Sequence, residues 1–172
     1  MTDLATLYVH NASRYVRDVH LDRLRAAADT LPDGDLWWRP HEGVISLGNI
    51  LLHLEGNVRQ WWISGLGGRS DARDRASEFE AGDGPTAAEL LDVLAETVRD
   101  GTDIVDRLGE AELVAPITIQ GMETTTLDAV LHVVEHFSWH TGQAVWIAKA
   151  RAGVAHGLAF YDDAAINAAR ND

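Results

Sequence analysis

The 172-residue chain contains no cysteine, which excludes disulfide bonds, thiolate metal ligands and a cysteine nucleophile. A metal site would therefore use histidine and carboxylate ligands, and a reaction that needs a thiol would take it from another molecule. Basic side chains are also scarce, because 14 Lys and Arg stand against 27 Asp and Glu and give a formal net charge of -13. This charge opposes binding to nucleic acid or to anionic lipid.

Long apolar runs are missing as well. No window approaches the roughly 18 apolar residues that a membrane-spanning helix needs, and the N-terminal MTDLATLYVH lacks the basic and apolar regions of a signal peptide. We therefore expect a cytoplasmic protein without a membrane partner. Hydrophobic residues make up 46% of the chain, which is typical of a globular protein, and the length predicts a single domain over residues 1–172.

Four segments carry apolar residues at the three- and four-residue spacing of amphipathic helices. Ser46 is available to cap the second segment, and a capping box from Thr86 to Glu89 opens the third, although Gly101 is unfavourable inside it. A short extended stretch is predicted just before the fourth. The predicted helices are 4–30, 47–66, 86–109 and Thr125 or Thr126 to Gly153, followed by a short C-terminal helix within 158–172.

The polar stretch GGRSDARDRASEFEAGDG separates the second and third predicted helices and has no periodicity. We predict a long loop here, of a length found more often in a lid or binding loop than in a simple connection. Four amphipathic helices in a chain of this length predict an all-α fold, a four-helix bundle. The interior of such a bundle is a usual place for a site built from facing helices.

Three histidines lie four residues apart in HVVEHFSWHTGQ, which begins at His132. Measured from the centre of the apolar stripe of this helix, His140 lies at roughly 60°, His136 at about 100° and His132 at about 140°. Residues four apart project side by side, so His136 and His140 can bind one cation, whereas His132 points outward. His53, on the edge of the second helix's apolar stripe, is the expected third ligand.

Three neutral imidazoles leave a coordination position for water or substrate, which is typical of a catalytic rather than a structural site. Each ligand also needs a partner for its second ring nitrogen, and Gln143, Asn57 and Glu55 are the candidates, with Gln143 the best placed. Arg39, before the second helix, is a candidate for binding an anionic substrate or for a salt bridge that fixes its turn.

Other interpretations of these residues stay open. A histidine beside an apolar stripe is often only a hydrogen-bonded boundary residue. The run from His132 to His136 also matches H-x-x-E-H, in which two histidines bind zinc and Glu135 is the base of a metallopeptidase. The helix angles disfavour that frame, because it uses the outermost histidine and places Glu135 about 160° from the stripe centre. The six tryptophans favour core or dimer packing over a substrate wall.

The histidine in LLHLEGNVRQW and the later pattern H-x-x-x-H-x-G-Q, which ends at Gln143, resemble the DinB-like (DinB/YfiT) metal-binding four-helix bundles. LWWRPHEGVISLGNILLHLEGN followed by RDRASEFE is similar to one uncharacterised branch of that superfamily, and the resemblance covers roughly residues 36–150. It implies an up-down-down-up bundle, commonly a homodimer. It also implies a divalent metal, often zinc or nickel, with ligands at His53, His136 and His140.

Characterised relatives in this superfamily include thiol-dependent transferases and a maleylpyruvate isomerase that use mycothiol or bacillithiol. The resemblance therefore implies a metal-dependent enzyme, either a thiol-dependent S-transferase or a hydrolase, that acts on a small electrophile. In such an enzyme the cation lowers the pKa of a bound thiol or water. A metal-binding module without catalysis, for instance a stress-related sensor or storage protein, and a purely structural helical homodimer are the alternatives.

Overall fold

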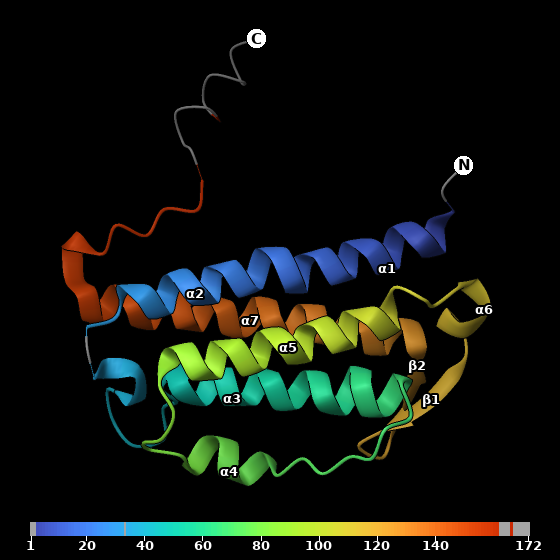
Figure 1. The fold of residues 1–172 in the computed structure, drawn as a ribbon, viewed down its shortest axis with the longest axis horizontal. Helices are drawn as coiled ribbons and strands as arrows, with labels where there is room; N and C mark the ends of the chain where they lie inside the picture. The colour runs from blue at the N-terminus through green and yellow to red at the C-terminus, as the bar shows by residue number, and fades with distance from the viewer. Residues whose placement is uncertain (1–2, 33, 162–165, 167–172) are drawn as a thin grey trace.

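The computed structural model describes residues 3–32, 34–161 and 166, and these residues are mostly helical with one small sheet. Four long helical segments lie side by side (Figure 1). The first and second each contain a π-helical stretch. The bounds are α1 Leu4–Arg14, a π-helix Tyr15–His20 and α2 Leu21–Thr30; α3 Leu47–Val58 and a π-helix Arg59–Leu66; α5 Ala87–Val105; and α7 Thr126–Ala152.

Each long segment begins at a side-chain cap, which satisfies a backbone N–H that the first helical turn leaves unpaired. The caps of α3 and α5 are capping boxes, in which the first and fourth residues exchange hydrogen bonds. These signals are local, and three of the four caps were predicted from the sequence. The capping residues are Asp3, Ser46, Thr86 and Thr125.

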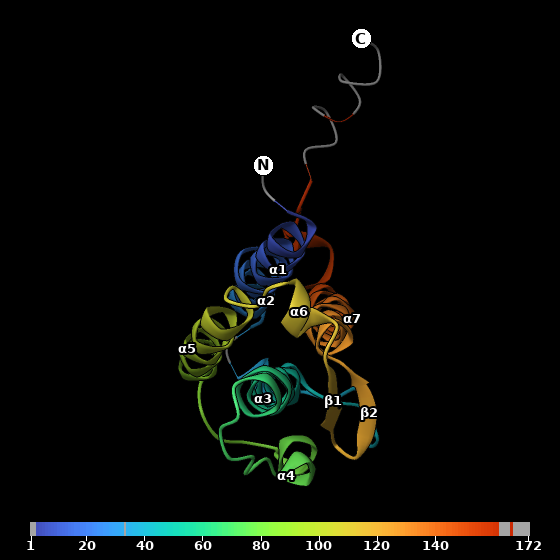
Figure 2. The same cartoon turned by 90° about the vertical axis from the view of Figure 1, so that its right-hand side faces the viewer.

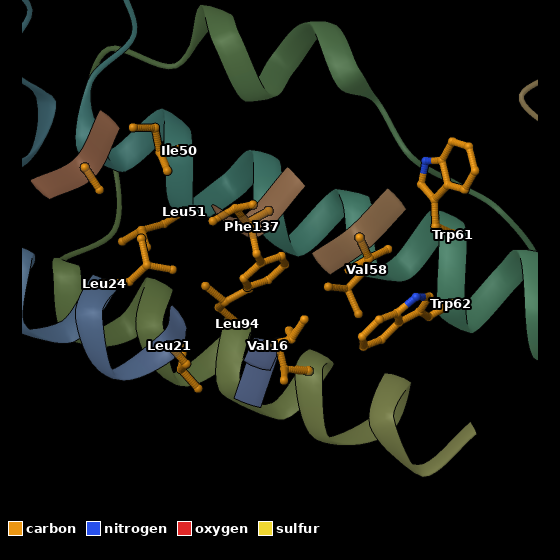
Figure 3. Close-up of a cluster of buried hydrophobic side chains, with 14 of the residues drawn as sticks. Val16, Leu21, Leu24, Ile50, Leu51, Val58, Trp61, Trp62, Leu94 and Phe137 are labelled. Carbon is orange, nitrogen blue, oxygen red and sulfur yellow. The ribbon is translucent and has the colours of Figure 1, made fainter. Parts of the chain in front are cut away.

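The hydrophobic core lies between the four long segments. Figure 3 shows Val16 from the first, Leu51 from α3, Leu94 from α5 and Phe137 from α7 close together, and all four side chains are buried. Burying a side chain of this size contributes about 1.5–3 kcal/mol relative to leaving it exposed. The predicted all-α class is therefore confirmed for the described residues, apart from one small hairpin.

That hairpin and a short helix lie between α5 and α7. The third long helix ends at Val105 rather than at the predicted Gly109, and Gly109 instead caps α6, Glu110–Leu113. Strand β1, Pro116–Ile119, pairs antiparallel with β2, Met122–Thr125. The turn residue Gln120 has a positive φ of 55°, which is uncommon for a residue other than glycine.

The segment predicted to be a structureless loop contains α4, Arg75–Glu80, which the side chain of Asp74 caps by accepting hydrogen bonds from two backbone N–H groups. A helix of six residues is too short to show a periodic apolar pattern, which explains why the sequence did not reveal it. Short 3-10 turns lie at Asp35–Trp37 and Gly153–Ala155. The predicted C-terminal helix falls largely on 162–165 and 167–172, outside the described residues.

Helix α3 is central to the arrangement of the site. In Figure 2 it is viewed nearly end-on, with α5 on one side, α7 and the hairpin on the other, and α4 below. The chain between α3 and α5 runs back along the bundle and brings α4 against α3 (Figure 1). Within the described part of the chain, no helix combines the length and apolar character that crossing a membrane requires.

Gly101, which is unfavourable for a helix on its own, allows close packing of α5 on α3. A Cβ atom at this position would lie 2.8 Å from Cγ1 of Val58 and 3.0 Å from Cε3 of Trp62. Gly142 in α7 is the opposite case, because an added Cβ there would meet nothing within 4 Å.

We expect Gly101→Ala to lower the free energy of unfolding by about 1–3 kcal/mol through overpacking. Gly142→Ala, the matched control, should raise it by about 0.5–1 kcal/mol because alanine is the better helix former. Urea denaturation of both variants measures the difference. Equal effects at the two positions would contradict the close packing of α3 on α5.

His20 is a buried titratable group remote from the candidate ligands in the sequence. Its side chain is 5% exposed, and among the described residues its Nδ1 has no hydrogen-bond partner. Burial, with a smaller effect from Arg23, lowers the pKa of His20 from 6.5 to about 4. Below pH 6.5 the unfolded chain takes up a proton that the folded protein resists until about pH 4, so stability is lost as pH falls through this window.

We therefore expect the free energy of unfolding to fall between pH 7 and pH 5, and the part due to His20 to be about 1 kcal/mol after allowance for solvent screening. Urea denaturation at both pH values should show a smaller fall for His20→Leu. The control is His10→Leu, at an exposed position of the same helical segment. Its free energy of unfolding should decrease between pH 7 and pH 5 as much as that of the wild type. Identical falls in the wild type and His20→Leu would contradict the buried, neutral state of His20.

Candidate metal centre

The imidazoles of His53 from α3 and of His136 and His140 from α7 meet between these two helices. The ring centroid of His53 lies 4.9 Å from that of each of the other two, which are 4.6 Å from one another. One nitrogen of each ring lies within 4.8 Å of the others. A tetrahedral zinc ion with Zn–N bonds of about 2.0–2.1 Å needs ligand nitrogens about 3.3 Å apart, so this group could hold a metal ion.

The protonation of these rings also fits a metal. His53 and His140 are buried, and His136 is half-buried. Burial lowers the pKa of His136 to about 3, helped by the neighbouring His140 and His53, and burial together with His53 lowers the pKa of His140 to about 4. Both rings are therefore neutral at physiological pH, and the neutral imidazole is the form that binds a metal.

A buried ion pair orients His53. Its Nδ1–H donates to Oε2 of Glu78 on α4 over 2.7 Å, which leaves Nε2 free to face His136 at 2.8 Å. Arg73 donates to both oxygens of the same carboxylate, at 2.6 and 2.9 Å. Burial alone would raise the pKa of Glu78, but the hydrogen bonds from Arg73 and His53 hold it below its usual range. The charged carboxylate therefore fixes the tautomer and orientation of His53.

Gly56 gives this ion pair its place against α3. A Cβ atom at this position would collide with the carboxylate of Glu78 and would lie 2.8 Å from Nε of Arg73. Because Gly56 has no side chain, the two charged groups can lie directly on the helix backbone one turn from His53.

Of the residues predicted to hydrogen-bond the second ring nitrogens, Gln143 does so and Glu55 does not. Oε1 of Gln143 accepts a hydrogen bond of 2.7 Å from Nδ1 of His140. Glu55 contacts no candidate ligand and instead binds Arg59 and Thr97 on the other side of α3, so that expectation was wrong.

Asn57 lies one turn along α3 from His53, and its contact is with His132 rather than with a candidate ligand. Nδ2 of Asn57 is 3.3 Å from Nε2 of His132. The His132 ring stacks on Trp61 with centroids 3.9 Å apart, and burial lowers its pKa. His132 is not part of the group that could hold a metal, and Glu135 is exposed, so the geometry gives the peptidase-like frame no support.

Arg39 does not line the candidate metal centre. Its guanidinium donates to Oδ1 of Asn49 at 2.9 Å and to the backbone carbonyls of Phe79, at 3.1 Å, and Ala81. The side chain thus holds the end of α4 against the start of α3. This contact secures the segment that carries Glu78, in place of the salt bridge that the sequence suggested.

Sequence reasoning missed Glu78 and Arg73 as partners of His53. The available signal was the short sequence DRASEFE, in which Asp74 caps a helical turn and Glu78 follows four residues later. The signal does not say which side of α4 faces α3, because that depends on how the segment folds back.

The helical fold of this chain is similar to that of a DinB-like protein. The crystal structure of a DinB-like protein (YjoA) from Bacillus subtilis is similar to this structure, with a TM-score of 0.63, 90% of this chain and 96% of that chain covered, and 17% sequence identity. The chain belongs to the family described as "Protein of unknown function (DUF1572)", whose model matches residues 3–155. The resemblance found in the sequence is confirmed. No curated protein matches this chain.

The Arg73–Glu78 pair predicts a large loss of stability when one partner is removed. Both side chains are under 10% exposed, so Glu78→Gln leaves a buried guanidinium without its counter-charge and should cost about 3 kcal/mol. The double variant Arg73→Met/Glu78→Gln should recover most of this loss. The control Glu96→Gln, in an exposed pair with Arg99, should stay within about 0.5 kcal/mol of the wild type.

Urea denaturation of the metal-free proteins measures these differences. A Glu78→Gln variant as stable as Glu96→Gln would contradict the buried ion pair.

Proposed function

We propose that this protein binds a divalent metal ion, zinc or nickel, through His53, His136 and His140. The observation that carries the proposal is the meeting of three imidazoles from two helices within 4.8 Å, two of them held by hydrogen bonds at the ring nitrogen that faces away from the group. Glu78 and Gln143 supply those hydrogen bonds. This arrangement leaves the Nε2 lone pairs of His53 and His140 available to a shared cation.

A metal in this position favours an enzyme over a structural role, because three protein ligands leave a coordination position for a substrate or nucleophile. When bound, a divalent cation lowers the pKa of a coordinated thiol or water. The chain has no cysteine of its own, so a thiol reaction would use a low-molecular-weight thiol such as mycothiol or bacillithiol. We therefore propose a thiol-dependent S-transferase or a hydrolase that acts on a small electrophile in the cytoplasm.

The proposal also includes the up-down-down-up order of the helices and a homodimer. The up-down-down-up order of the helices is supported by the course of the chain between α3 and α5, which returns along the bundle before α5 begins (Figure 1). A homodimer is supported by exposed aromatic side chains on α7, since Trp139 is 63% and Trp146 is 61% exposed. These two indoles line an apolar groove together with Val44 and Ile45.

Metal analysis of the untagged protein tests the proposal. Wild-type protein supplemented with zinc or nickel should retain about one ion per chain, and His140→Ala should retain almost none because two neutral ligands do not suffice. The matched control is His132→Ala, which changes a histidine of the same helix that is not part of the group. This variant should retain the wild-type amount of metal. Circular dichroism of each variant shows whether the helical fold persists.

Two results would contradict the proposal. Absence of any bound first-row metal after supplementation would favour a hydrogen-bonded histidine cluster in a structural protein. Loss of metal in His132→Ala with retention in His140→Ala would favour the peptidase-like frame. Turnover of an electrophile with a small thiol then separates an enzyme from a metal-binding module without catalysis.

A further inference from the structure

A small cavity of about 330 Å³ lies beside the candidate metal centre. His53 and His136 contribute to its wall, so a ligand in the cavity would contact two of the three proposed metal ligands. The volume is near the lower end of the roughly 300–1,000 Å³ that is usual for small-molecule sites. The other lining residues that matter here are Asn57, Arg73, Arg75, Gln120 and His132.

Two arginines, Arg73 and Arg75, and no carboxylate line this cavity, although Glu135 and Asp128 act on His132 from outside its wall. Glu78, the buried carboxylate nearest to His53, is already paired with Arg73 through two hydrogen bonds. Arg75 makes no ion pair or hydrogen bond within the part of the chain that the structure describes.

Arg75 is an exposed residue whose guanidinium stacks on an aromatic ring beside the metal centre. Its Cζ lies 4.7 Å over the ring centroid of Phe79, and the same ring lies 4.7 Å from the ring of His53. Phe79 is thus a spacer between the cation and a proposed metal ligand. A guanidinium stacked in this way keeps its N–H donors available for a carboxylate or a similar oxyanion.

Two polar residues complete the wall. Asn57 is 2% exposed, and its Oδ1 has no hydrogen-bond partner among residues 3–32, 34–161 and 166, although a buried amide oxygen is normally paired. Gln120 lies at the tip of the hairpin with its unusual positive φ, and its side chain contacts Gln60, which in turn accepts a hydrogen bond of 3.0 Å from Arg73.

We infer that this cavity binds a small organic anion, with one end at the metal and a carboxylate or comparable oxyanion at the guanidinium of Arg75. The inference rests on the proposed metal site and names the class of substrate for it. Three neutral imidazoles do not cancel the charge of a divalent ion, so the metal and Arg75 together favour a molecule with two anionic or strongly polar ends.

The test uses full-length protein loaded with cobalt(II), whose visible absorption reports on its coordination. Malonate, succinate and glutarate, which differ in the spacing of their carboxylates, are titrated into the wild type and two variants. At least one of the three should change the spectrum with millimolar or tighter affinity. Arg75→Gln should weaken this binding about tenfold while leaving the cobalt content unchanged, and Arg75→Lys should be intermediate.

The matched control is Arg99→Gln, an exposed arginine on α5, which should bind the same dicarboxylate as tightly as the wild type. Cobalt binding without any spectral change by the three dicarboxylates, or equal affinities of Arg75→Gln and Arg99→Gln, would overturn the inference and leave the metal site standing. A protein that binds no cobalt would overturn the metal site and this inference together.

Discussion

The hydrogen-bonded chain from Arg73 through Glu78 to His53 is the interaction on which the site depends. It connects a segment outside the four long helices to a buried side chain of α3, and all three groups are removed from water. The buried carboxylate of Glu78 is tolerable only because Arg73 supplies its counter-charge and His53 donates a further hydrogen bond to it. Gly56 leaves the space in α3 that the pair occupies. The orientation of His53 is thus set by side chains on a different element.

The site is electrically unlike the rest of the molecule. The chain carries a net negative charge, yet the carboxylate nearest the three imidazoles is paired with Arg73, and Arg75 lies at the cavity without an ion pair among the described residues. Surface charges beyond about 10 Å are largely screened at physiological salt, so the nearest groups determine the local field. The net negative charge of the chain is therefore compatible with the proposed anion site.

Sequence reasoning succeeded where structure is set within one helix. Ser46 and Thr86 could be recognised as caps because capping is a local signal, and the approach of His136 to His140 follows from their spacing of four residues in α7. The partner of His53 was harder, because Glu55 faces away from it on α3 and Asn57, one turn further along the same face, contacts His132 instead. Glu78 reaches His53 across 25 residues through a segment without periodicity, and no rule of helix geometry places such a contact.

Because Glu78 lies outside the bundle, the residues that form the core and the residues that surround the cavity lie on different parts of the chain. The four long helices build the core and carry the three imidazoles, whereas the chain between α3 and α5 supplies the carboxylate, the stacked guanidinium and part of the cavity wall. Connecting segments accept sequence change more readily than core helices do. A related chain could therefore acquire a different ligand preference by altering this one segment, with no change to the helices that carry the three imidazoles.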